Sequence, residues 1–394
     1  MPASPSLESK NISGQRPTWA EIDLDALAAN FHVIKRHVGS GINVMAIVKA
    51  NAYGHGAVAC ARRLASEGAD WFGVALPEEG IELRESGITQ PILCLGGFWE
   101  EQAAACVKYH LTPVVYRLDM IAELDRAAGA AGTSIDVHLK IDTGMGRLGF
   151  RFDEINDTPA LLKRFDHLRV DGLMTHFAAA DDPTCEALTE DQIARFASAA
   201  GAFRHAGHQP TFQHSANSAA IYSHPDAWGN MIRPGGVLYG LWRDVLPAKV
   251  DASQLKPVMS LHSRISLLKW VPAGETIGYG CTFEASRKTL VATIPIGYDD
   301  GYPRAISNRG HVMVRGVYAS VIGRISMDLT LVDVTGVPGV ESGDQVVLIG
   351  NDGDAGHSVT AEELAKISGT LSYEITCGIG SRVPRLQRVL NVSR

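Results

Sequence analysis

A lysine that follows an apolar run is the first residue of the chain whose surroundings suggest chemistry. Lys49 comes after five consecutive apolar residues, within the stretch Ala46-Ile-Val-Lys-Ala-Asn-Ala-Tyr-Gly-His-Gly56. Burial disfavours a charged ammonium, so a lysine in this position should have a lowered pKa. A partly neutral lysine can form a Schiff base with a carbonyl cofactor. The alternative is a solvated charge at a strand end, and Lys49 by itself leaves that alternative open.

A serine and two glycines farther along the chain suggest a site for a phosphate group. Ser218 follows one apolar run, and Gly235 and Gly236 lie within the next. A hydroxyl and backbone N–H groups bind phosphate, and glycine lets the backbone approach closely. Tight turns would explain the same residues. Together with a reactive lysine, however, a phosphate site fits pyridoxal 5′-phosphate (PLP), which carries both an aldehyde and a phosphate.

Two further motifs contain polar residues whose role depends on their context. The stretch Gly144-Met-Gly-Arg-Leu-Gly149 matches the dinucleotide pattern G-x-G-x-x-G, but it follows the fifth apolar run and opens no clear helix. We therefore interpret Arg147 as an arginine that binds an anionic oxygen beside the cofactor, the alternative being a surface arginine. His176 has no second ligand at a suitable spacing, so no metal site is predicted.

These residues lie near the ends of eight short apolar runs, most of them separated by segments of helical composition. The runs are Ile42–Val48, Trp71–Leu76, Pro91–Leu95, Leu111–Tyr116, Ile135–Ile141, Val170–His176, Thr211–His214 and Met231–Leu238. Apolar runs that do not alternate are typical of parallel strands buried on both faces. Eight such units predict an α/β fold, a (β/α)8 TIM-type barrel with its active site at the carboxyl ends of the strands. Because the seventh run is short and contains His214, a doubly wound sheet is the alternative.

The chain divides into three expected parts. Residues 1–17 are polar and rich in Pro and Ser, which predicts a disordered tail rather than a signal peptide. Residues 18–249 are the expected PLP-binding barrel, and residues 250–394 are a mostly β C-terminal domain. A capping box predicts one helix between Thr360 and Gly369. The strands expected in the second domain lie within Val258–Trp270, Leu290–Ile296, Gly310–Val317, Ala319–Ile325 and Gln345–Ile349.

The composition is that of an ordinary globular protein. The chain has 394 residues, of which 45% are hydrophobic and 20% charged, and its formal net charge is −7. A negative net charge disfavours non-specific binding to nucleic acid or to anionic membranes, and no apolar run is long enough to span a bilayer. None of the six cysteines forms a CxxC pair, so neither a zinc site nor a redox motif is indicated. We expect a cytoplasmic protein with reduced thiols.

Taken in order, these motifs resemble those of the alanine racemase family over nearly the whole chain after the tail. The stretch Ala46–Gly56 is similar to the PLP-lysine motif of that family. The other similar segments are Asp142–Gly149, Thr175–Phe177, Asn217–Ala220, Arg233–Gly235, Ile277–Gly280, Ile296–Tyr302, Gly323–Asp328 and Ser372–Ile375. A small departure is Gly236, where some relatives carry a larger aliphatic residue. The resemblance implies a PLP-dependent isomerase that interconverts L-alanine and D-alanine, for peptidoglycan synthesis or for alanine catabolism.

The resemblance also implies how the cofactor is held. Lys49 binds it covalently and acts as one catalytic base. Arg233 donates to the pyridine nitrogen, and His176 packs behind the ring and supports Arg233. Arg147 contacts the phenolic oxygen of the cofactor and the carboxylate of the substrate. The residues implied to hold the phosphate, by side chain or backbone, are Tyr53, Ser218, Gly235, Gly236 and Tyr373.

A homodimer with a shared active site is implied as well. Tyr279 of the other subunit acts on the opposite face of the substrate. Met327 of that subunit binds the substrate carboxylate through its backbone N–H, with Asp328 beside it and Tyr298 also near the substrate. Lys140 matches a lysine that is carbamylated in several relatives, where it orients Arg147.

Three other functions stay open at this level. A PLP racemase of serine or of broad specificity would use the same residues, although crowding by Tyr279, Tyr298 and Tyr373 favours a small side chain. A PLP decarboxylase can be built on a similar barrel. The third possibility is a non-enzymatic PLP-binding protein, but its single-domain relatives lack the second domain and the segment around Tyr279.

Overall fold

Eight parallel strands lie where the apolar runs predict them. The computed structural model describes residues 14–155, 158–351 and 356–388. Its first sheet has the order β10-β2-β3-β4-β5-β6-β8-β9, and these pairings are parallel. The strands are β2 (Asn43–Ile47), β3 (Trp71–Val74), β4 (Ile92–Cys94), β5 (Thr112–Val115), β6 (Ile135–Asp142), β8 (Leu168–Met174), β9 (Phe212–His214) and β10 (Met231–Ile232). A short strand, β7 (Phe150–Arg151), adds to β6.

The sheet closes on itself between β9 and β10. The backbone N–H of Asn230 donates to Gln213 O at 3.2 Å, and that of Arg233 donates to Ala216 O at 3.0 Å. Since the strands follow chain order and the sheet closes, the fold is the predicted barrel, and the doubly wound alternative is wrong. The helices of this part are α1 (Leu24–Val38), α2 (Lys49–Tyr53), α3 (Ala57–Ser66), α4 (Pro77–Glu85), η2 (Glu100–Gln102), α5 (Ala103–Lys108), α6 (Leu118–Ala130), α7 (Thr158–Leu162), η4 (Pro183–Cys185), α8 (Glu186–His205), α9 (Ser218–Ser223), η5 (Pro225–Ala227) and η6 (Gly236–Tyr239).

The second domain is built on a mixed sheet of the order β12-β15-β18-β17-β16-β19-β11-β1-β21. Its strands are β11 (Met259–Arg264), β12 (Leu267–Val271), β15 (Thr289–Ile294), β16 (His311–Val314), β17 (Val317–Val321), β18 (Thr330–Asp333), β19 (Gln345–Asn351), β20 (Ser358–Val359) and β21 (Arg385–Arg388), with a small hairpin of β13 (Thr276–Ile277) and β14 (Phe283–Glu284). The sequence analysis missed the short strands β13, β14, β18, β20 and β21. The helices are η7 (Tyr279–Cys281), η8 (Tyr298–Asp300), η9 (Arg304–Ile306), α10 (Ala361–Ser368) and α11 (Ser372–Gly378). No helix of the described ranges combines the length and apolarity needed to cross a membrane.

The capping box of α10 forms as predicted. The backbone N–H of Glu363 donates to Thr360 Oγ1 at 3.1 Å, and the backbone N–H of Thr360 donates to Glu363 Oε2 at 2.9 Å. The helix ends at Gly369, whose φ of +76° is left-handed. Local sequence is sufficient here because every group of the cap lies within four residues.

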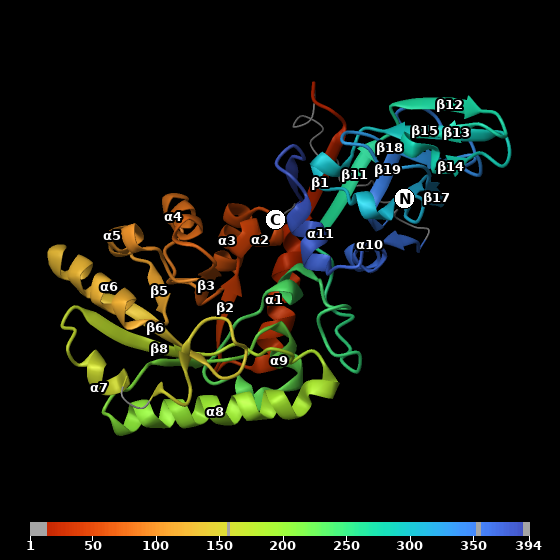
Figure 1. Ribbon diagram of the computed structural model, residues 1–394. Helices are drawn as coiled ribbons and strands as arrows, with labels where there is room; N and C mark the ends of the chain where they lie inside the picture. Colours follow the sequence, from red (N-terminus) through yellow and green to blue (C-terminus); the bar gives the residue numbers. More distant parts are fainter. Residues whose placement is uncertain (1–13, 156–157, 352–355, 389–394) are drawn as a thin grey trace, which may run out of the picture.

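The first strand, β1 (Thr18–Asp23), belongs to the second sheet although it precedes the barrel in the chain. It pairs antiparallel with β11 and parallel with β21 (Figure 1). This differs from the expected boundary, which assigned everything from residue 18 to the barrel. No local pattern could show it, since both partner strands are more than 230 residues away in the sequence.

Part of the expected tail is also ordered. Most of it, residues 1–13, lies outside the described residues. Arg16, however, forms an ion pair with Asp300 at 2.6 Å, and Ser263 Oγ donates to Pro17 O at 3.1 Å. The expectation of disorder is therefore wrong for these two residues, because long-range partners hold them.

Candidate active site

Lys49 follows β2 and opens a left-handed turn. The next four residues, Ala50–Tyr53, have φ between +52° and +54°, although none is glycine. Each such residue costs roughly 1 kcal/mol or more, so the turn needs support from outside. The backbone N–H of Ala50 donates to Glu79 Oε1 at 2.6 Å, and that of Ala57 donates to Asn51 Oδ1 at 2.8 Å. The turn places Lys49 and Tyr53 close together at the carboxyl end of β2.

Four cationic side chains gather at the carboxyl ends of the barrel strands. Burial lowers the pKa of Lys49, and the charge of Arg147 lowers it further. Burial, followed by the charges of Arg147 and Arg233, lowers the pKa of Lys140 to about 8. Burial lowers the pKa of Arg233 to about 9, which leaves it protonated at neutral pH. Because these cations repel one another, the site is suited to a ligand with several negative charges.

A polar cradle lies next to the lysine turn. We use this name for Tyr53, Ser218, Gly235, Gly236 and Tyr373. The backbone N–H of Gly235 donates to Ser218 Oγ at 3.0 Å, and the rings of Tyr53 and Tyr373 meet edge to face with centroids 5.1 Å apart. A Cβ built on Gly235 would lie 2.5 Å from Tyr53 Oη, and one on Gly236 would lie 2.1 Å from the Tyr373 ring. Little room is left for a side chain at either glycine, and the hydroxyl groups of Tyr53, Ser218 and Tyr373 lie next to this stretch of backbone.

Arg233 is buried, and no carboxylate of the described residues pairs with it. Its Nη2 donates to Thr175 O at 2.8 Å and to Ser215 O at 3.0 Å, and it lies 3.3 Å from His176 Nδ1. Its Nη1 donates to His214 Nδ1 at 2.9 Å. Neutral acceptors thus hold the guanidinium in place while leaving its charge uncompensated.

The hydrogen bonds determine the protonation of a chain of two histidines behind Arg233. Since arginine can only donate, His214 Nδ1 must accept, and the proton of His214 is on Nε2. That nitrogen lies 2.8 Å from His138 Nδ1, which therefore accepts, and the proton of His138 is on its Nε2. The His138 Nε2 atom is buried and has no hydrogen-bond partner among the described residues. Burial, and then the charge of Arg233, lowers the pKa values of both rings, which keeps them neutral.

Acid is expected to destabilise the protein through such histidines. Burial lowers the pKa of His138 to about 3 and that of His55 to about 4. Between these values and the unfolded pKa near 6.5, the unfolded state binds more protons. The free energy of unfolding should therefore decrease as the pH is lowered through this range, by up to about 1.4 kcal/mol per pH unit for each histidine. Urea unfolding at pH 7, 6 and 5 measures this, and His138→Gln should reduce the slope. An unfolding free energy that stays constant down to pH 5 would contradict the prediction.

A glutamine that the sequence analysis missed joins two of the site loops. Gln192 on α8 is fully buried. Its Nε2 donates to Thr143 Oγ1 and to His176 O, both at 3.2 Å, and its Oε1 accepts from Ala178 N at 3.0 Å. Gln192 thereby connects the loop that carries Arg147 to the loop that carries His176. The only sign of Gln192 in the sequence was a polar residue at a helical position, and the sequence did not show which groups its side chain would bind.

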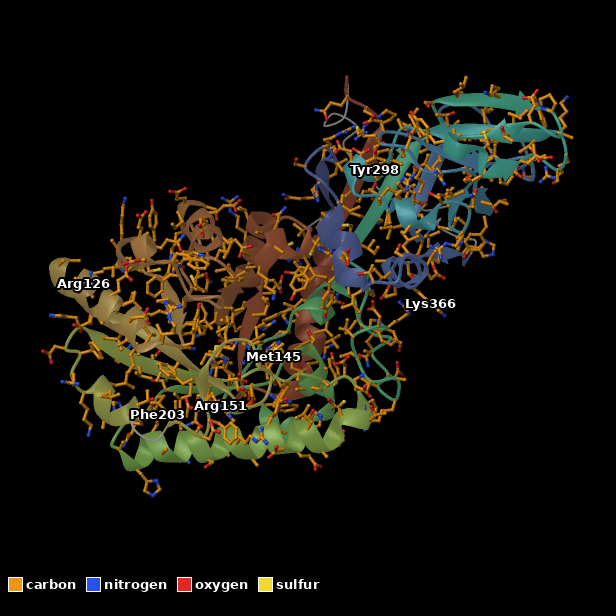
Figure 2. All side chains as sticks on the ribbon, viewed as in Figure 1. Arg126, Met145, Arg151, Phe203, Tyr298 and Lys366 are labelled. Atoms are coloured by element: carbon orange, nitrogen blue, oxygen red, sulfur yellow. The ribbon has the colours of Figure 1, made fainter. Side chains whose placement is uncertain are left out.

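The remaining candidate residues lie on the second domain, away from Lys49 in the same chain. Tyr279 is 72% exposed and Met327 is 51% exposed, and Tyr298 and Asp328 are exposed as well. Figure 1 places β13 and β14, the strands on either side of η7 in the chain, on the side of this domain that faces away from the barrel. Figure 2 shows Tyr298 in the second domain and Met145, two residues before Arg147, in the barrel. The structure therefore brings Tyr373 of the second domain together with the barrel residues. It leaves the other second-domain candidates, Tyr279, Tyr298, Met327 and Asp328, apart from them.

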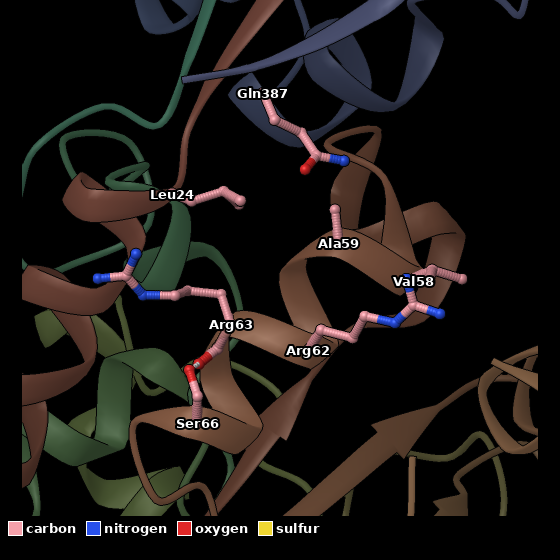
Figure 3. A pocket seen from close by; sticks show the side chains of 7 residues that line it. All are labelled: Leu24, Val58, Ala59, Arg62, Arg63, Ser66 and Gln387. Atoms are coloured by element: carbon pink, nitrogen blue, oxygen red, sulfur yellow. Dashed lines mark hydrogen bonds between the residues drawn. The ribbon is translucent and has the colours of Figure 1, made fainter. Parts of the chain in front are cut away.

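A separate hollow of about 360 Å³ lies between α1, α3 and β21 (Figure 3). It contains Arg62 and Arg63, but Arg63 is paired with Asp25 and Glu67, and Arg62 donates to Ser86 O. It includes none of the residues that the sequence analysis selected. Its arginines are used in contacts between helices, so the hollow is not part of the candidate site.

Fold and site together define a class of two-domain proteins in which a lysine with a lowered pKa and other cationic side chains lie at the mouth of a parallel barrel. The family model "Alanine racemase, N-terminal domain" matches residues 22–242, and "Alanine racemase, C-terminal domain" matches residues 258–387. The chain belongs to the alanine racemase family.

Individual relatives agree with this assignment. The alanine racemase of Geobacter sulfurreducens is 46% identical over 375 residues, covering 94% of this chain and 97% of that protein. That of Symbiobacterium thermophilum is 43% identical, covering 95% and 98%. The solved structure of alanine racemase from Clostridium difficile 630 has a TM-score of 0.88 and 37% identity, covering 94% of this chain and 96% of that one.

Proposed function

We propose that this chain binds PLP and interconverts L-alanine and D-alanine as a cytoplasmic homodimer. One observation supports this more than any other in the site. Tyr53 belongs both to the left-handed turn of Lys49 and to the cradle, so one short supported turn carries the amine and part of the cradle. The six cysteines, all free thiols, support a reducing compartment.

The residues present fit PLP at each of its polar groups. The cradle offers hydroxyl groups and bare backbone to a phosphate, and the lowered pKa of Lys49 suits it to hold the aldehyde carbon. Arg233 would donate to the ring nitrogen and, as a guanidinium, would keep its own proton. When bound, PLP delocalises the negative charge that develops at Cα of the amino acid.

The chain's own residues would supply the proton transfers. Racemisation removes the α-proton from one face and returns a proton to the other, so a base is needed on each face. Lys49 Nζ would act on one face, and Tyr279 Oη of a second subunit on the other. Arg147 would bind the carboxylate of the amino acid and hold it still during both transfers.

The second domain supports a dimer in which one subunit covers the barrel mouth of the other. Gly278, Tyr279, Ser326, Leu329 and Leu331 line a pocket on it. Nearby, Ser326 N donates to Leu329 O at 3.0 Å, closing a tight turn. Within the described part of the chain, the backbone N–H groups of Met327 and Asp328 donate no hydrogen bond. Two adjacent free N–H groups in a turn suit a carboxylate. An active species of monomer mass in analytical ultracentrifugation would overturn the dimer.

Lys140 is expected to carry a carbamate. Its pKa of about 8 leaves part of the amine neutral near neutral pH, whereas an ordinary lysine is almost fully charged. The neutral amine adds to CO2 and releases one proton, and the anion formed would orient the nearby Arg147. Labelling with ¹³C-bicarbonate should give a carbamate NMR signal that grows from pH 6.5 to 8.5. A signal that persists in Lys140→Ala would assign the carbamate elsewhere and contradict the prediction.

Chiral chromatography tests the proposed function directly. Purified protein is incubated with L-alanine and PLP, and in parallel with L-serine and L-lysine. The proposal requires D-alanine, formed faster than D-serine or D-lysine, without release of CO2. Release of CO2 would indicate a decarboxylase, and a folded, PLP-loaded protein that produces no D-amino acid would indicate a binding protein.

A further inference from the structure

Three segments of the second domain meet next to the turn Ser326–Leu329. The backbone N–H of Tyr298 donates to Ser326 O at 3.0 Å, and that of Asp299 donates to Met327 O at 3.1 Å. The backbone N–H of Gly380 donates to Asp300 O at 2.9 Å. Backbone hydrogen bonds therefore already hold η8, this turn and the segment after α11 together.

Three carboxylates and two guanidinium groups lie at this junction. Arg382 forms ion pairs with Asp299, with Asp328 at 2.6 Å and with Asp300 at 3.2 Å. Asp300 is fully buried and is also bound by both terminal nitrogens of Arg16, at 2.6 and 2.8 Å. Asp299 and Asp328 are half exposed, and Arg382 is the one cation among the described residues that forms an ion pair with either of them.

The turn Ser326–Leu329 offers two free N–H groups to the carboxylate of a substrate. It also carries the negatively charged side chain of Asp328. Asp328 carries its carboxylate on the same turn as the N–H groups of Met327 and Asp328, and this charge would repel an approaching carboxylate. We propose that Arg382 is a positioning residue that neutralises Asp328 and Asp299, so that the turn can accept the carboxylate of the amino acid in the partner subunit's barrel. The inference rests on the proposed function, which places this turn at the substrate.

The effect of Arg382 should be electrostatic rather than that of a tether, since backbone hydrogen bonds hold the three segments. In Arg382→Gln at low ionic strength, the KM for alanine should rise about 10-fold and kcat should change less than about 2-fold. The inhibition constant of propionate, which has the carboxylate but no amine, should rise in parallel. Near 1 M salt, where the screening length is about 3 Å, both differences should shrink to about 3-fold or less.

A second substitution separates charge from structure. In Arg382→Gln/Asp328→Asn, the unpaired carboxylate on the turn itself is removed and only that of Asp299 stays unpaired, so KM and the propionate constant should return to within about 3-fold of wild type. Arg382→Lys keeps the charge and should stay close to wild type. The matched control is Arg287→Gln, which breaks an ion pair with Asp333 at 3.0 Å in the same domain and should leave KM unchanged.

Each outcome decides the matter. An unchanged KM in Arg382→Gln overturns the inference, and so does a raised KM that the double variant does not restore. If Arg382→Gln fails to fold, Asp328→Asn replaces it, and a KM above that of wild type overturns the inference. A wild-type protein that forms no D-alanine would instead remove the proposed function itself.

Discussion

Replacing Lys49 by alanine is expected to lower the rate of alanine racemisation by at least about 10³-fold, because both the covalent link to the cofactor and one base are lost. Chiral chromatography of D-alanine formed from L-alanine measures the rate. The visible absorption of lysine-bound PLP should disappear as well, even if the cradle still holds the phosphate. Lys49 has a lowered pKa and shares its turn with Tyr53 of the cradle, which suits it to this role.

A surface lysine provides the control for this variant. Lys108 at the end of α5 stacks on Tyr109 with Nζ 5.1 Å from the ring centroid. It lies outside the candidate site, so Lys108→Ala should racemise alanine at the wild-type rate. Lys49→Ala with more than a tenth of wild-type activity would show that another residue performs its role.

Replacing Tyr279 by phenylalanine is expected to lower racemisation by about 10² to 10⁴-fold, the usual contribution of a general acid or base. The loss should depend on the face of the substrate. Lys49 remains, so one enantiomer should still exchange its α-hydrogen in D2O while the other does not. Tyr318→Phe is the matched control, because this tyrosine is also exposed in the second domain and donates to Ser358 O at 3.0 Å.

Mixing the two inactive variants tests whether Tyr279 acts across a dimer. In a dimer of one Lys49→Ala chain and one Tyr279→Phe chain, a shared site can combine the intact Lys49 of one chain with the intact Tyr279 of the other. With random mixing, half of the dimers contain one chain of each variant, and one of the two sites in each such dimer is intact. About one quarter of wild-type activity should then return. If both residues acted within one chain, each chain would stay defective, and no activity would return.

Several site features could not be read from local sequence. The left-handed turn after Lys49 contains no glycine until Gly54, so nothing in Ala50–Tyr53 indicated it. It depends on Glu79, which reaches it from α4. The buried chain joins Arg233 just after β10, His214 at the end of β9 and His138 in the middle of β6, and only the packing of the barrel brings them within hydrogen-bonding distance.

Local sequence is enough to predict the eight barrel strands, the cap of α10 and the positions of the candidate residues at strand ends. These depend on nearby residues: a parallel strand buried on both faces must be apolar throughout, and a capping box spans four residues. The tertiary structure decided that β1 joins the second sheet, that Gln192 joins two site loops, and that Arg382 faces three carboxylates. It also left Tyr279 exposed on the second domain, whereas Lys49 follows a barrel strand. Such contacts join segments far apart in sequence, so their partners are set by packing and hydrogen bonding rather than by any local pattern.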